Sequence, residues 1–268
     1  MFWTRLMSGI LLVIITVACI VLGGNVMFGV VAAISFIGLY ELYRVFKMEK
    51  DIFGILGYVF TAVYYMLLYF GHKEFVTELL IGFLICMLAV YVFKYPKYKS
   101  EHFMAGLFGM VYVVFMLSYL YQIRMLPFGA YLTGLVFFCA WGCDTCAYVV
   151  GMTLGKHRLA PILSPKKSIE GAVGGVIGAA LLGAIYGIVC ERFGWIAIEG
   201  NLVVIFAILC GVGGIISQIG DLAASGIKRN HDIKDYGTLI PGHGGILDRF
   251  DSIIITAPII FTLASIMM

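Results

Sequence analysis

The chain has 268 residues, of which 62% are hydrophobic and 12% are charged, with a mean hydropathy of +1.03 and a formal net charge of +3. Soluble domains carry about 25% charged residues, so this composition excludes a water-exposed globular protein. The apolar runs are long and continuous, whereas a transmembrane β-barrel needs short segments in which polar and apolar residues alternate. We therefore expect an all-α, polytopic integral membrane protein.

Nine apolar runs divide the chain, and a membrane-spanning helix needs about 20 mainly apolar residues. In chain order they lie near 6–23, 25–46, 52–71, 76–94, 103–123, 130–151, 171–190, 201–223 and 250–267. Apolar residues continue beyond Cys19 in the first run, which favours an uncleaved membrane helix over a signal peptide. We predict about nine transmembrane helices, an N-terminal group over 1–125 and a C-terminal group over 126–268, with long polar loops at 152–170 and 226–249.

The basic residues are distributed unevenly over the predicted loops. If the N-terminus is cytoplasmic and the chain crosses nine times, only Lys73, Arg124 and Arg192 of the 18 Lys and Arg residues fall on the outer side. Cytoplasmic loops of membrane proteins carry such an excess of positive charge. The distribution therefore predicts a cytoplasmic N-terminus and places both long polar loops on the cytoplasmic side, where nucleotides are found.

Asp144 and Asp221 are acidic residues that lie within apolar runs. Asp144 lies within "CAWGCDTCAYVVG", where a charged side chain costs about 2.5–3.5 kcal/mol on insertion scales. It predicts either a functional site or a structural hydrogen bond between helices. Asp221 lies near the cytoplasmic end of the eighth run, and Ser217, Ser225 and Lys228 follow the spacing that places all four on one helix face.

Asp248 and Asp251 open the ninth run, three residues apart. A helix N-terminus favours one such carboxylate, but this does not explain the basic and glycine-rich residues beside them, including "PGHGG" at 241–245. Carboxylates brought together repel one another, and a divalent cation reverses that repulsion. Oxygen ligands without a histidine or thiolate cluster favour Mg²⁺, which keeps waters and binds substrate phosphates. The pattern predicts a Mg²⁺–polyphosphate site, with one ion or two left open.

Other short motifs indicate less. "GMTLGKH" at 151–157 resembles a phosphate-binding loop, but its glycine spacing is one residue short and no Ser or Thr follows Lys156. "CDTC" at 143–146 lacks the second ligand pair of a structural zinc site. Gly174 and Gly178 have the spacing that lets helices approach closely. We expect this contact within the chain, while a homodimer through the same face is left open.

The segment 225–252, "SGIKRNHDIKDYGTLIPGHGGILDRFDS", closely resembles the signature of phosphatidate cytidylyltransferases. The signature positions are met by Ser225, Lys228, Arg229, Lys234, Asp235, His243, Gly244, Gly245, Asp248, Arg249 and Asp251. Two upstream segments, "CDTCAYVVG" (143–151) and "SPKKSIEG" (164–171), are also similar to the family, although Cys146 stands where a larger apolar side chain is expected. The N-terminal half is similar only in its apolar helices and in "YELYR" (40–44).

The resemblance implies that CTP and phosphatidic acid react in the presence of Mg²⁺ to give CDP-diacylglycerol and pyrophosphate, in phospholipid biosynthesis, within the region 126–268. It implies membrane lipids and no nucleic acid as partners. A bacterial inner (cytoplasmic) membrane is expected as the location, since no long extension precedes the first run.

The residues and the resemblance together give a candidate site. The expected catalytic residues are Asp144, Asp221, Asp248, Asp251 and Lys167, of which Asp221, Asp248 and Asp144 are the expected metal ligands. The expected substrate-binding residues are Lys166, Lys167, Ser225, Lys228, Arg229, His243, Gly244, Gly245 and Arg249.

Two other functions use the same residues differently. A CTP-dependent lipid kinase would transfer the γ-phosphoryl group to a lipid alcohol and would need a base, for which His243 or Asp251 are candidates. An ion-coupled secondary transporter would use Asp144 and Asp221 as ion sites within the membrane. Transporters often show matched halves with broken helices, and no such repeat is visible in this sequence.

Overall fold

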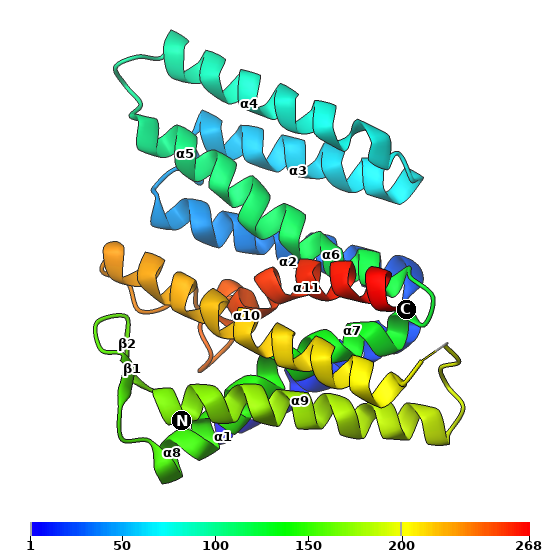
Figure 1. The fold of residues 1–268 in the computed structure, drawn as a ribbon. Coiled ribbons are helices and arrows are strands. Elements are labelled where there is room, and N and C mark those ends of the chain that lie inside the picture. Colours follow the sequence, from blue (N-terminus) through cyan, green and yellow to red (C-terminus); the bar gives the residue numbers. More distant parts are fainter. Residues whose placement is uncertain (1, 199) are drawn as a thin grey trace.

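The computed structural model describes residues 2–198 and 200–268, with side chains described from residue 6 onward. It is a bundle of long helices (Figure 1). The α-helices are α1 (Phe2–Leu22), α2 (Gly24–Val45), α3 (Ile52–Phe70), α4 (Val76–Phe93), α5 (Ser100–Gly109), α6 (Met116–Arg124), α7 (Gly129–Phe137), α8 (Cys143–Leu154), α9 (Ile169–Arg192), α10 (Leu202–Asn230) and α11 (Leu247–Met267). A short 3-10 helix, η1 (Lys73–Phe75), precedes α4, and two π-helical segments, η2 (Met110–Phe115) and η3 (Phe138–Gly142), join α5 to α6 and α7 to α8.

The helices follow the predicted apolar runs. Among the described residues, eight continuous helices are long and apolar enough to span a membrane, and residues 6–22 of α1 form a further, shorter apolar helix. The prediction of an all-α, multi-pass membrane protein is therefore confirmed.

Both predicted polar loops are shorter than expected. The first contains a small antiparallel hairpin, β1 (Arg158–Ala160) and β2 (Ser164–Ser168), which hydropathy did not indicate. The second covers only 231–246, because α10 continues to Asn230 and α11 already begins at Leu247. Lys228, Arg229, Asp248 and Arg249 consequently lie on helices, where backbone hydrogen bonds fix them, and not on a loop.

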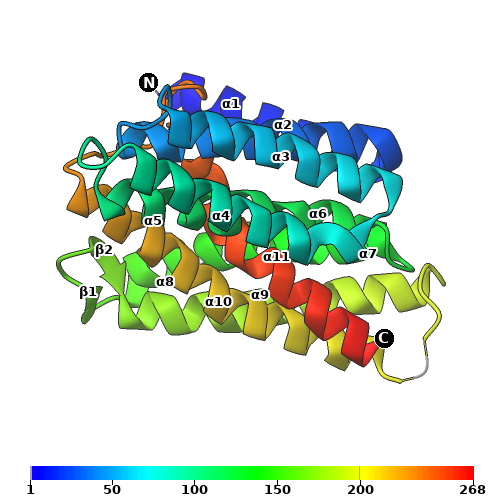
Figure 2. The same cartoon turned by 90° about the horizontal axis from the view of Figure 1, so that it is seen from above.

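The connections that carry most of the basic residues gather at one end of the bundle. In Figure 1 the α2–α3 and α4–α5 connections, the β1–β2 hairpin and the end of α10 all lie at the left. Figures 1 and 2 both show α11 beginning well inside the bundle, whereas α10 extends to its end. The loop 231–246 must therefore turn back into the protein before α11 starts.

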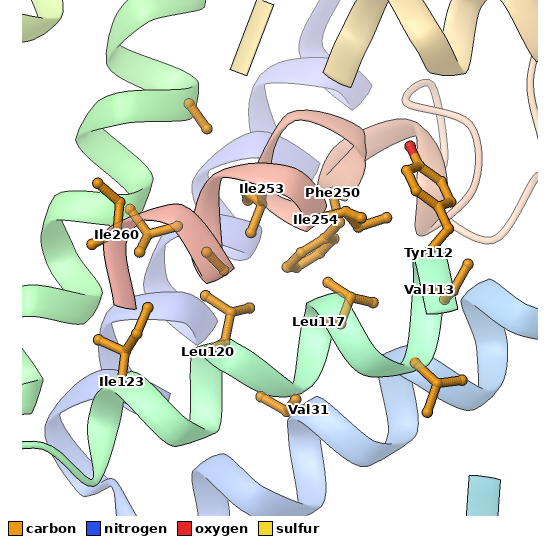
Figure 3. Close-up of a cluster of buried hydrophobic side chains, with 14 of the residues drawn as sticks. Val31, Tyr112, Val113, Leu117, Leu120, Ile123, Phe250, Ile253, Ile254 and Ile260 are labelled. Atoms are coloured by element: carbon orange, nitrogen blue, oxygen red, sulfur yellow. The ribbon is translucent and has the colours of Figure 1, made fainter. Parts of the chain in front are cut away.

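Close packing sets the positions of α8, α9 and α11. A Cβ atom added at Gly174 would lie 2.6 Å from Val150, and one at Gly178 would lie 2.5 Å from Cys146, so these glycines let α9 lie directly against α8. The predicted intramolecular contact is confirmed. On the other side of the bundle, Leu117 and Leu120 of α6 are directed toward α11 (Figure 3). Between such surfaces, van der Waals packing is the main attraction, because lipid tails are as apolar as the side chains.

Candidate functional site

A cavity of about 650 Å³ opens between α8, α9, α10 and the β1–β2 hairpin. Its polar lining includes Asp144, Lys166, Lys167, Ser168, Gln218 and Asp221. These residues come from three separate segments, and 77 residues separate Asp144 from Asp221, so the fold and not local spacing creates the site. The structure thus brings four of the predicted site residues, two acidic and two basic, to one cavity.

Asp221 of α10 forms an ion pair with Lys167 of β2 across this cavity. Their side chains are 25% and 26% exposed, so both groups remain accessible to a ligand from the cavity. Gln218, one turn earlier on α10, is held in place by donating to the carbonyl oxygen of Ala172 at 2.9 Å. The hairpin therefore brings a lysine over the carboxylate that α10 presents.

Asp144 enters the same cavity from α8, directly after the π-helical segment η3. Such segments shift the direction of the following side chains and are frequent at functional sites. The Asp144 carboxylate interacts electrostatically with Asp221, Lys167 and Arg249. The charged side chains of the cavity and those at the start of α11 therefore form one continuous electrostatic cluster.

Asp248 is enclosed within the protein, with a side chain only 2% exposed. One carboxylate oxygen, Oδ1, accepts a hydrogen bond from Lys228 Nζ at 2.9 Å. The other, Oδ2, accepts from the backbone N–H groups of Tyr236 at 2.8 Å and Gly245 at 2.9 Å. A buried carboxylate is tolerated when paired and hydrogen-bonded in this way, so Asp248 joins α10, the loop 231–246 and α11.

Asp251 lies one turn beyond Asp248 and is also buried. Its Oδ1 accepts from the backbone N–H of Ser252 at 2.8 Å, and its charge interacts with Asp221 and Lys228. The Nε atom of Arg249 and the hydroxyl of Ser252 are buried without a hydrogen-bond partner among the described residues. Buried polar atoms of this kind usually bind an ordered water or a ligand atom.

The donor chemistry fits Mg²⁺, and the ligand set of Asp144, Asp221 and Asp248 stays a prediction. Within the described parts of the chain, no three His, Cys, Asp or Glu side chains are grouped to hold a metal ion. Asp144 and Asp221 nevertheless line one cavity, and protein sites commonly bind Mg²⁺ through one or two carboxylates, completed by water and substrate phosphates. Asp248 differs from these two because both of its oxygens already have partners within the protein.

Several predicted substrate-binding residues lie outside the cavity. Arg229 points to a separate surface hollow that it shares with Asp232 and Lys234. His243 is directed toward α1, where its Nδ1 lies 2.8 Å from the hydroxyl of Ser8. Gly244 adopts a positive φ of 84° beside Asp248, so the loop glycines shape the turn around that carboxylate.

Three further residues near the cluster were not among the predicted site residues. Glu41 of α2 contacts the start of α11, and no spacing rule links it to a segment 205 residues away. Tyr112 of η2 has a buried hydroxyl without a hydrogen-bond partner among the described residues, and it interacts electrostatically with Asp251. In Figure 3 the Tyr112 ring lies beyond Leu117, at the end of the cluster of labelled side chains.

Tyr236, in the loop, packs its ring under Lys228, whose Nζ lies 5.4 Å from the ring centroid. Its hydroxyl donates to the carbonyl oxygen of Ala224 at 3.0 Å, and burial raises the pKa of this hydroxyl. The side chain is therefore a neutral hydrogen-bond donor that fastens the loop to α10.

Comparison with known proteins identifies the family of the chain. The chain matches the Cytidylyltransferase family over residues 3–267. It is 30% identical to the phosphatidate cytidylyltransferase of Bacillus subtilis (strain 168), over 98% of this chain and 97% of that protein. Identity is 31% with the phosphatidate cytidylyltransferase of Staphylococcus saprophyticus, covering 96% of each chain, and 30% with that of Thermotoga maritima, covering 89% and 87%. The match extends over nearly the whole chain, so this membrane protein belongs to the cytidylyltransferase family and is a nucleotidyltransferase.

Proposed function

We propose that this protein transfers the cytidylyl group of CTP to phosphatidic acid, giving CDP-diacylglycerol and pyrophosphate for phospholipid biosynthesis. The observation that carries the proposal is the cavity in which Asp144, Asp221 and Lys167 meet, at the end of the bundle where the basic connections gather. The relatives named above are phosphatidate cytidylyltransferases. We further propose that this end of the bundle faces the cytoplasm of a bacterial inner membrane, with the N-terminus on the same side.

The reaction needs positioning and charge neutralisation more than a strong base. An oxygen of the lipid phosphate forms a bond to the α-phosphorus of CTP, and the bond from that phosphorus to the bridging oxygen breaks, so that pyrophosphate leaves. The second pKa of a phosphomonoester is about 6, so the attacking phosphate is largely dianionic at neutral pH. Lys166 and Lys167 line the cavity and would bind the phosphate oxygens as their charge redistributes.

We also propose Mg²⁺ as the cofactor, held by Asp144 and Asp221. Bound there, Mg²⁺ would neutralise phosphate charge and orient the reacting groups. Asp251 interacts electrostatically with Asp221 and Asp144, and together with the pair of Lys228 and Asp248 it would fix the electrostatic field around them.

The position of the transferred phosphorus tests this function. Purified protein in mixed micelles with phosphatidic acid is expected to move label from α-labelled CTP into the lipid fraction, and to release pyrophosphate. Removing Mg²⁺ with a chelator should abolish the transfer, and adding Mg²⁺ back should restore it. The measurement is label in the extracted lipid over time.

The same assay with γ-labelled CTP is the control. Label that enters lipid from the γ-position, and not from the α-position, would identify a lipid kinase and contradict the proposal. If neither label enters lipid, while transport of an ion or solute into vesicles is observed, the transporter becomes the better explanation.

A further inference from the structure

The start of α11 is buried, and its first backbone N–H groups need hydrogen-bond acceptors. Two of these groups find no acceptor among the neighbouring residues of the chain. The first N–H groups of a helix have no partner within the helix, and inside a membrane protein they must be satisfied by protein atoms. Glu41 of α2 satisfies two such groups. Its Oε1 accepts from the N–H of Ile246 at 3.0 Å and its Oε2 accepts from the N–H of Leu247 at 2.9 Å, while the residue is only 3% exposed.

The loop is shaped to receive this carboxylate. A Cβ atom added at Gly237 or at Gly245 would overlap the Glu41 carboxylate, so both positions leave the space that it occupies. Arg44, one turn later on α2, donates to the carbonyl oxygen of Tyr236 at 2.5 Å. Through Glu41 and Arg44, one face of α2 holds both ends of the segment 236–247.

The same segment holds Asp248. The N–H groups of Tyr236 and Gly245 donate to Asp248 Oδ2, while Oδ1 faces Lys228. Because Glu41 satisfies the next two N–H groups along the chain, the Asp248 carboxylate does not have to turn toward them. Its orientation toward Lys228 and the charged cluster therefore depends on a residue of the N-terminal half.

We propose that Glu41 is a positioning residue for the transfer reaction, acting through the segment 236–247 on Asp248, and that Arg44 supports it. This inference rests on the function proposed above. It assigns a role in the reaction to α2, whose segment 40–44 resembles the family but lies outside the C-terminal signature 225–252. A carboxylate is required because two oxygens accept two N–H groups, and charge-assisted hydrogen bonds are about twice as strong as neutral ones.

The test compares Glu41→Gln with Glu101→Gln, a matched change of an exposed acid at the start of α5. The amide can accept through only one of its two polar atoms, so one N–H loses its partner and the segment shifts. We expect kcat to fall at least about tenfold in Glu41→Gln, since a displacement of 1 Å in a site can cost about 100-fold. Glu101→Gln should behave like the unmodified protein.

Activity is expressed per mole of CTP bound, so that loss of folded protein does not count as loss of kcat. The number of CTP sites per chain should be unchanged in Glu41→Gln. Unchanged turnover per bound CTP would overturn the positioning role. This includes the case in which total activity falls only in proportion to the number of CTP sites. If Glu41→Gln does not fold, Arg44→Met replaces it, with a smaller fall of about threefold expected from the loss of one hydrogen bond of modest strength.

Hydrogen exchange gives a readout that does not depend on the reaction. Peptides covering 236–247 should exchange faster in Glu41→Gln and not in Glu101→Gln, whatever substrate the protein uses. Unchanged exchange there would overturn the structural step of the inference. Faster exchange in a protein that transfers no α-label from CTP would instead keep that step and reject the proposed function.

Discussion

Replacing Asp221 by Asn is expected to lower kcat at least about 100-fold while changing thermal stability very little. Asp221 lines the cavity and is paired with Lys167, and both side chains are about one quarter exposed. Pairs that contact solvent contribute about 0–1 kcal/mol to stability, so the fold should tolerate the change. Charged groups aimed at a reacting centre are worth far more, with losses of about 100-fold to 1,000-fold when one is removed.

The measurement is label transfer from CTP at saturating substrate, together with thermal unfolding in the same detergent. Asp232→Asn is the matched control, because Asp232 lies in the neighbouring polar loop and lines a separate surface hollow. An Asp221→Asn protein with normal kcat would show that the chemistry takes place elsewhere. A large drop in unfolding temperature would show instead that Asp221 supports the fold.

The sequence predicts the helices well because the membrane restricts the choices. A chain in lipid must satisfy its backbone within each segment, so a long apolar run can only become a helix here. This requirement holds only inside the lipid, so it does not predict where a helix ends once the chain has left the apolar region. Residues 226–230 are polar enough to suggest a loop, yet α10 continues through them, and the β1–β2 hairpin forms from a stretch without apolar alternation.

The site is predicted less completely, because residue type does not reveal which partner a charge has. Asp221 and Asp248 are equivalent candidates in the sequence. The structure separates them: Asp221 faces a cavity, whereas Asp248 is enclosed by Lys228 and two backbone N–H groups. Such differences arise from the packing of α10 against α11 and from the turn of the loop between them, which no spacing along the chain encodes.

Asp248→Asn is therefore expected to damage both stability and activity. With the amide oxygen accepting from Tyr236 and Gly245, its NH2 group would face Lys228 Nζ, which lies 2.9 Å from the present Oδ1. Lys228, whose side chain is only 14% exposed, would then lose the carboxylate to which it is hydrogen-bonded. Breaking such a pair by removing one partner costs about 3–5 kcal/mol, so we expect a clear drop in unfolding temperature along with loss of label transfer.

A second substitution separates the two effects. Lys228→Met removes the ammonium group that Asp248→Asn leaves unpaired, and it keeps an apolar side chain against the Tyr236 ring. The double variant Lys228→Met with Asp248→Asn is expected to recover most of the lost stability, because replacing a buried pair by uncharged groups is often neutral. Label transfer should stay absent, since the charged pair of Lys228 and Asp248 is gone. Recovery of transfer together with stability would contradict this, because it would mean that the pair supports only the fold. If the stability loss of the double variant equals the sum of the losses of the two single variants, Lys228 and Asp248 do not depend on one another for stability.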